Sequence, residues 1–213
     1  MKTKKESEKK SERKTKILAV GDIHGDSGLV KRLAKKAEQE NVDLVIFAGD
    51  ITLGNREMKN IIAPFQKINM PVLLIPGNHE GGDTTDFLSQ VYDNATNIHG
   101  YAFKKNDLGI FGAGTVDWGR EGKNSDEILK LLRRGHKYIK DQDKKIMVTH
   151  MHHQGSKAEI FGFKGSKAVR KAIEEFHPDV LISAHIHEAG GLQEKIKNTF
   201  VINVSRNPTI FEI

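Results

Sequence analysis

The chain alternates short, continuously apolar runs with longer segments in which apolar residues recur every three or four positions. Continuous apolar runs are typical of β-strands buried on both faces, and the longer spacing is typical of amphipathic helices. The predicted strands cover residues 17–20, 43–48, 72–75, 98–103, 108–111, 146–149, 180–183, 191–195, 199–203 and 209–212. The predicted helices cover residues 29–40, 57–68, 125–138 and 166–176.

The order of these elements indicates the fold class. Strands and helices alternate in the first half of the chain, whereas strands dominate the second half. Ser125 and Ser166 are suitable caps for the last two helices, and Pro64 is expected to disturb the helix predicted over residues 57–68. Residues 112–124 are glycine-rich and are predicted to form a loop. We therefore predict an α/β fold with two stacked mixed β-sheets flanked by helices, a four-layer α/β/β/α sandwich.

Composition narrows the class of protein. The length of 213 residues suits one domain with a tail. The chain has no cysteine, which excludes a disulfide framework, thiolate zinc sites, iron–sulfur clusters and cysteine nucleophiles. No apolar run approaches the roughly 18 residues of a membrane span, and the basic start lacks the apolar region of a signal peptide. We therefore expect a cytoplasmic protein that does not associate with membranes.

The net charge of +6 is concentrated at the N-terminus. Residues 1–16 hold eight of the 34 basic and three of the 28 acidic residues, so they carry five of the six net charges. This segment has one apolar residue and cannot bury enough surface to offset its ordering entropy. We predict that residues 1–14 form a flexible basic tail and residues 15–213 form the domain. The tail is either solubilising or a salt-sensitive contact for nucleic acid.

Polar residues that bind metals follow five of the predicted strands. Ligands of open α/β sheets bind beyond the C-terminal ends of the strands, so these residues are expected to meet at one edge. Carboxylate, amide and imidazole ligands suit manganese, iron, zinc or nickel. The residues are Asp22, His24, Asp50, Asn78, His150, His185 and His187, and His79 follows directly after Asn78.

Each of these motifs is weak by itself. A Gly-Asp pair after a strand is usually turn chemistry, and a single His-x-His is commonly a surface pair. The joint pattern is harder to explain without a metal. Seven convergent ligands exceed the four to six of one ion, and two ions that share a carboxylate sit about 3.5–4 Å apart. Such a pair activates a bridging water for in-line attack at phosphorus.

The motifs GDIHG, GD, GNHE, VTH and AHIH, in this order, resemble the calcineurin-like metallophosphoesterase superfamily. The resemblance extends from about residue 16 to the end of the chain and is closest to small archaeal and bacterial members without a large appended domain. It implies a catalytic role for His79, which would contact the phosphate and protonate the leaving oxygen. It implies that Asp22, His24 and His187 hold the first metal, that Asn78, His150 and His185 hold the second, and that Asp50 bridges both.

Three departures from the family pattern bear on the site. Ala184 stands where the family usually has glycine, and Leu53 stands where several branches have an aspartate that orients the catalytic histidine. The usual His-x-Pro-Pro motif is replaced by a segment with three histidines. His150 is the preferred ligand because it directly follows the strand, and His152 is the second candidate, as a ligand or as a phosphate contact.

Two loops are expected to form the walls of the substrate site, at residues 112–122 and 152–165. In the first loop, Trp118 would stack on a base and Arg120 would meet a phosphate, or Trp118 would only pack the loop onto the domain. A dinucleotide fingerprint, a P-loop, an HExxH motif and a GxSxG elbow are all incomplete or missing. Dehydrogenase, kinase, zinc-peptidase and lipase functions are therefore disfavoured.

The leading functional hypothesis is a binuclear metal-dependent phosphoesterase. Its nucleophile would be a metal-bridging water, and its substrate a small phosphodiester, with cyclic nucleotides as candidates, or a phosphomonoester. One alternative is a non-catalytic metal-binding scaffold of the same fold, although such proteins tend to lack the histidine found here at position 79. Another is a nuclease that uses the basic tail to hold nucleic acid.

Overall fold

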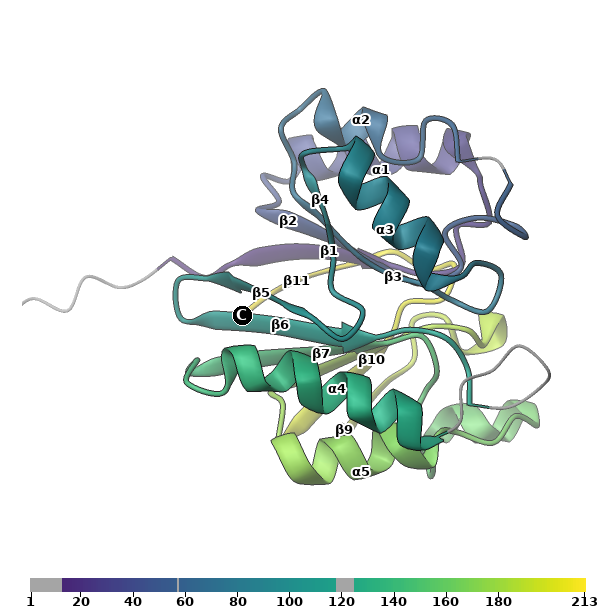
Figure 1. Ribbon diagram of the computed structural model, residues 1–213, viewed down its shortest axis with the longest axis vertical. Coiled ribbons are helices and arrows are strands. Elements are labelled where there is room, and N and C mark those ends of the chain that lie inside the picture. Colours follow the sequence, from purple (N-terminus) through teal and green to yellow (C-terminus); the bar gives the residue numbers. More distant parts are fainter. Residues whose placement is uncertain (1–12, 57, 118–124) are drawn as a thin grey trace, which may run out of the picture.

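Two β-sheets stack face to face, and helices cover the outer face of each sheet, in a computed structural model that describes residues 13–56, 58–117 and 125–213 (Figure 1). This arrangement confirms the predicted four-layer sandwich. The five-stranded sheet has the order β11 (Thr209–Glu212), β1 (Lys16–Val20), β2 (Leu44–Ala48), β3 (Val72–Ile75) and β4 (Ala95–Asn97). The six-stranded sheet has the order β5 (Ala102–Lys105), β6 (Leu108–Ala113), β7 (Lys144–Thr149), β8 (Val180–Ser183), β10 (Thr199–Asn203) and β9 (Gln193–Ile196).

The strands are continuously apolar because both faces of each sheet are buried. In β1, Ile17 and Ala19 belong to the core between the sheets, whereas Leu18 and Val20 belong to the core beneath the helices. Successive side chains of a strand point to opposite faces, so a run without polar residues is what a sheet covered on both sides requires.

The helices pack in two groups. On the first sheet lie α1 (Ser27–Gln39), α2 (Ala63–Gln66) and α3 (Gly82–Val91), and on the second lie α4 (Ser125–Ile139) and α5 (Lys167–Phe176). Two 3₁₀ helices, η1 (Lys157–Phe161) and η2 (His187–Ala189), complete the elements. Ser166 caps α5 as predicted, since its Oγ accepts from the N–H of Val169 at 3.2 Å. Ser125 is not a cap but the first residue of α4, and its hydroxyl donates to Asp117.

Two predicted elements were wrong, and one helix was not predicted. The helix predicted over residues 57–68 is only the single turn α2, because Pro64 lacks an N–H and fits only at the start of a helix. The strand predicted over residues 98–103 lies mostly in the connection between β4 and β5, which turns at Gly100, whose φ of 73° is in the left-handed region. The helix α3 was not predicted, since glycines occupy its N-cap and its first position and it lacks a strong apolar period.

Strand direction brings the candidate ligands together. The neighbours β1, β2 and β3 are parallel, as are β6, β7 and β8. The loops that follow these strands therefore lie along one edge of the sandwich (Figure 1). Most of the predicted tail, residues 1–12, lies outside the described residues. Among the helices that the structure describes, none is both long and apolar enough to cross a membrane.

Candidate metal centre

Three side chains from opposite ends of the chain form a first group of possible ligands. Ligand atoms of Asp22, which follows β1, and of His24 and His187 lie within 4.8 Å of one another. His187 Nε2 is 3.4 Å from Asp22 Oδ1 and 3.4 Å from His24 Nε2. One carboxylate and two imidazoles at these separations match the ligand types of a first-row divalent metal.

A second group lies beside the first. It consists of Asp50 after β2, His150 after β7 and His185 after β8, again within 4.8 Å. His150 Nε2 is 3.5 Å from Asp50 Oδ2 and 3.1 Å from Asn78 Oδ1. The other ring nitrogen of His150 donates to the carbonyl oxygen of Ala48 at 2.9 Å, which turns Nε2 toward the carboxylate and the amide.

Asp50 connects the two groups. Its Oδ2 is 4.0 Å from His24 Nε2 and 3.9 Å from His79 Nε2, and these three residues form a third group. Its other oxygen, Oδ1, accepts the N–H groups of Asn78 at 2.7 Å and His79 at 2.9 Å. Two backbone donors thus hold one oxygen of Asp50, and the other faces histidines of both groups, as a bridging ligand requires.

One buried oxygen supports the assignment of cations to this site. Asp22 Oδ1 is buried and has no hydrogen-bond partner in the part of the chain that the structure describes. Asp22 Oδ2, in contrast, accepts from the hydroxyl of Ser205 at 2.6 Å and the N–H of His185 at 3.0 Å. A buried carboxylate oxygen without a partner is costly, and a divalent cation between Asp22, His24 and His187 would remove that cost. The residues present therefore fit a metal.

The backbone is strained where these ligands lie. Asp22, His24, Asp50 and His185 have φ values of 56°, 48°, 51° and 72°, in the left-handed region. For residues other than glycine this conformation costs on the order of 1–3 kcal/mol each, and such strain clusters at functional sites.

Burial and neighbouring charges set the protonation of the site. Burial lowers the pKa of His185 to about 3, so this imidazole is neutral and able to bind a metal. Burial would lower the pKa of His150 as well, but the Asp50 carboxylate raises it to about 9. Burial would raise the pKa of Asp50, but His150 holds it well below its usual range. Without metal, Asp50 and His150 form an ion pair, and metal binding must release the His150 proton.

Glu80 holds together two of the loops that carry these ligands. Its carboxylate is 5% exposed and accepts the N–H groups of Ile51 and Thr52, at 3.0 Å each, and of Gly77 at 2.9 Å. The Thr52 hydroxyl adds a fourth contact at 3.2 Å. One side chain thus joins the loop after β2, with Asp50, to the loop after β3. The motif GNHE contained this residue, but its contacts span 28 and 29 positions and could not be predicted.

The alanine at position 184 fits because of a glycine on the opposite sheet. Ala184 has no left-handed backbone and is fully buried. A Cβ added to Gly21 would lie 2.4 Å from the Cβ of Ala184. The absent side chain of Gly21 therefore provides the space that the Ala184 methyl occupies.

Leu53 is half exposed, and no carboxylate hydrogen-bonds the His79 ring among the described residues. The His79 ring instead lies edge-on to His24, with 4.9 Å between centroids.

Of the three residues predicted to contact the substrate, the structure describes only His152. His152 is buried but belongs to none of the three groups, and its Nε2 donates to the carbonyl oxygen of Phe163 at 3.2 Å. This contact favours a role in holding the segment around Phe163. Trp118 and Arg120 lie outside the described residues.

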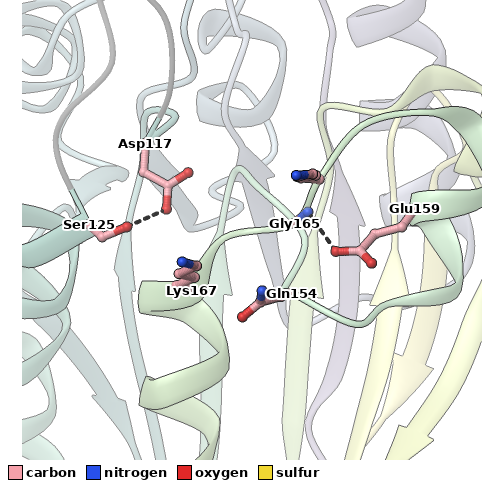
Figure 2. A pocket seen from close by; sticks show the side chains of 7 residues that line it. Asp117, Ser125, Gln154, Glu159, Gly165 and Lys167 are labelled. Carbon is pink, nitrogen blue, oxygen red and sulfur yellow. Dashed lines mark hydrogen bonds between the residues drawn. The ribbon is translucent and has the colours of Figure 1, made fainter.

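A large cavity lies apart from the candidate ligands. It has a volume of about 490 Å³ and lies between the starts of α4 and α5 (Figure 2). Its carboxylates already have partners: Asp117 accepts the hydroxyls of Ser125 at 2.9 Å and Ser166 at 2.6 Å, and Glu159 accepts the N–H of Gly165 at 2.9 Å. No predicted metal ligand lines this cavity, so it is not the candidate centre.

Comparisons with known proteins agree with this geometry. The family model described as calcineurin-like phosphoesterase matches residues 15–189. No curated protein sequence matches the chain. Several solved structures share the fold at low identity. The protein TT1561 of Thermus thermophilus has a TM-score of 0.74 and 17% identity, covering 94% of this chain and 99% of that one. A dimetal phosphatase from Danio rerio has a TM-score of 0.67 and 14% identity, covering 89% and 87%. An archaeal phosphodiesterase has a TM-score of 0.54 and 16% identity, covering 93% and 99%.

Proposed function

The chain belongs to the calcineurin-like phosphoesterase family, and from this premise we propose that it is a binuclear metal-dependent phosphoesterase. The match confirms the resemblance drawn from the five motifs. The observation that carries the proposal is the position of Asp50, whose Oδ2 faces His24 and His79 on one side and His150 on the other. A single carboxylate shared by two ligand groups is the arrangement that supports in-line attack at phosphorus.

The proposed ligand sets follow the groups described above. Divalent ions bound there would supply a nucleophilic water at neutral pH and draw negative charge from the phosphate. The first set is Asp22, His24 and His187, the second is Asn78, His150 and His185, and Asp50 is shared. Neutral His185 is ready to bind, whereas His150 must first lose a proton.

His79 is the proposed general acid. Its side chain is 40% exposed, so it is open to a substrate, and its Nε2 is 3.9 Å from Asp50 Oδ2. In this position His79 would contact the phosphate and donate its proton to the leaving oxygen.

The test is hydrolysis of a panel of phosphate esters in the presence of manganese. We expect cleavage of bis(p-nitrophenyl) phosphate or of p-nitrophenyl phosphate by the wild type, with small phosphodiesters favoured. Asp50→Asn should lower kcat/KM by about a thousandfold or more, because it weakens both ligand sets at once. His79→Ala should lower kcat by about 10²–10⁴-fold while manganese still binds.

Two results would contradict the proposal. If the wild type binds manganese but cleaves no ester in the panel, the protein is a metal-binding scaffold of the same fold. If Asp50→Asn leaves kcat/KM unchanged, the activity does not come from this centre.

A further inference from the structure

We propose that the cavity beside His79 is an anion subsite for a second phosphoryl group, carried by the leaving group of the substrate. This inference rests on the proposed function and names a substrate class for it: esters with two phosphoryl groups a few atoms apart. The cavity has a volume of about 290 Å³, and its lining includes Asn78, His79, Gly81, Gly82 and Thr115. It therefore borders both the candidate metal centre and the proposed general acid.

A buried hydroxyl in this lining has no partner. Thr115 is 9% exposed, and its Oγ1 is buried without a hydrogen bond among the described residues. Its backbone is held in place, because the N–H of Thr115 donates to the carbonyl oxygen of Pro76 at 3.0 Å. A buried hydroxyl without a partner loses the free energy of its hydration, so the structure favours a ligand that would accept a hydrogen bond there.

The N-terminus of α3 opens on the same cavity and has no side-chain cap. Gly81 is the N-cap residue and cannot offer a side-chain acceptor. The N–H of Thr84 donates to the carbonyl oxygen of Gly81 at 3.1 Å, so the N–H groups of Gly82 and Asp83 are the ones left for a ligand of this ten-residue helix. In contrast, α1 is capped by Asp26, and α5 is capped by Ser166. Backbone N–H groups and the positive end of the helix dipole together favour an anion.

Neither packing nor backbone conformation requires the two glycines at this helix start. Gly81 and Gly82 do not have left-handed φ values. A Cβ on Gly81 would meet only the backbone nitrogen of Asp83 at 3.9 Å, and one on Gly82 would meet only His99 Cδ2 at 3.9 Å. Their missing side chains leave room for a ligand to approach the N–H groups. Two carboxylates oppose an anion here. Asp83 is exposed and does not line the cavity, whereas Glu80 lines it, with its charge shared among the N–H groups of Ile51, Thr52 and Gly77 that it accepts.

The position of His79 indicates which part of the substrate enters the cavity. His79 contributes both to the third ligand group and to the cavity lining. In the proposed reaction His79 protonates the leaving oxygen, so the leaving group lies on this side of the phosphorus. A leaving group with its own phosphate would place that phosphate against Thr115 and the start of α3.

The experiment compares two phosphonates that cannot be hydrolysed. Calorimetry on the manganese-loaded full chain measures the Kd of 1,2-ethylenebisphosphonate and of ethylphosphonate, and the ratio of the two Kd values reports the subsite. Thr115→Val removes the hydroxyl but keeps the shape. Gly82→Glu places a carboxylate at the helix start, where it stabilises the helix and repels an anion. Gln90→Glu, an exposed position near the other end of α3, is the control with the same charge change.

We expect the wild type to bind the bisphosphonate at least about tenfold more tightly than the monophosphonate, and Thr115→Val and Gly82→Glu each to reduce this ratio about tenfold. Gln90→Glu should leave the ratio unchanged. Equal Kd values in the wild type, or a ratio that neither variant lowers, would overturn the subsite. Because these measurements need no turnover, they are independent of p-nitrophenyl phosphate hydrolysis, whose loss in the wild type would instead overturn the proposed function.

Discussion

Replacing Glu80 by glutamine tests whether one buried carboxylate holds the candidate centre together. The carboxylate accepts four hydrogen bonds from three backbone N–H groups and one hydroxyl. In Glu80→Gln, one acceptor oxygen becomes an NH₂ group that faces N–H donors. Hydrogen bonds to a buried charged group contribute about 1.5–3 kcal/mol each, so the loss of two should lower the free energy of unfolding by about 3–6 kcal/mol.

Urea unfolding of the metal-free protein, followed by circular dichroism, measures this change. The matched control is Glu159→Gln, since Glu159 Oε1 also accepts two backbone N–H groups, from Gly155 at 3.0 Å and Gly165 at 2.9 Å, but at a more exposed position. The control should change the free energy of unfolding by about 1 kcal/mol or less. Glu80→Gln should also weaken manganese binding by about 10–100-fold, because it loosens the loops that carry Asp50 and Asn78. Equal unfolding of the two variants would refute this reasoning.

Three further predictions concern the ligands themselves. Since Asp50 raises the pKa of His150 to about 9, above the ordinary 6.5, the stability from this ion pair is present below pH 6.5 and is lost as the pH rises through 9. In chelator, the free energy of unfolding should therefore fall by about 2–3 kcal/mol between pH 7 and 10, and a flat profile would contradict the pairing. Manganese at a hundred times its Kd should stabilise the protein by about 2.7 kcal/mol, measured by urea unfolding, and EDTA should reverse the effect; no shift would argue against a resident metal. Ser205→Ala removes the hydroxyl that donates to Asp22 Oδ2 at 2.6 Å, so a manganese titration should show about 10–100-fold weaker binding, and unchanged affinity would show that Asp22 needs no such support.

The sequence predicted the parts of the molecule that depend on local pattern. The runs that became β2, β3 and β8 have both faces buried, so their composition alone revealed them. The same reasoning predicted that residues after the strands would meet at one edge. Asp50 after β2 and His150 after β7 do meet, with Oδ2 and Nε2 3.5 Å apart, although they are a hundred positions from each other in the chain. Element boundaries were less predictable where glycine or proline interrupts the pattern, as at Pro64.

What could not be predicted depends on contacts between distant segments. Ser205 lies 183 positions from Asp22, and no motif marks it. The helix α3 begins at Gly82 after the N-cap Gly81, and two glycines indicate a loop, so the sequence did not reveal the open helix start beside His79. The missing partner of Thr115 Oγ1 is likewise a property of three-dimensional packing, because the sequence around Thr115 predicts only a glycine-rich loop.

The contact between Gly21 and Ala184 makes the effect of one substitution depend on the other. The two positions share space for one methyl group, since a Cβ on Gly21 would lie 2.4 Å from the Cβ of Ala184. Gly21→Ala should therefore be damaging in this chain but tolerated after Ala184→Gly. The steric contact therefore makes the two substitutions epistatic. The chain can acquire both if Ala184→Gly comes first, but not if Gly21→Ala comes first. The loops of the two sheets can therefore change at this point only as a pair.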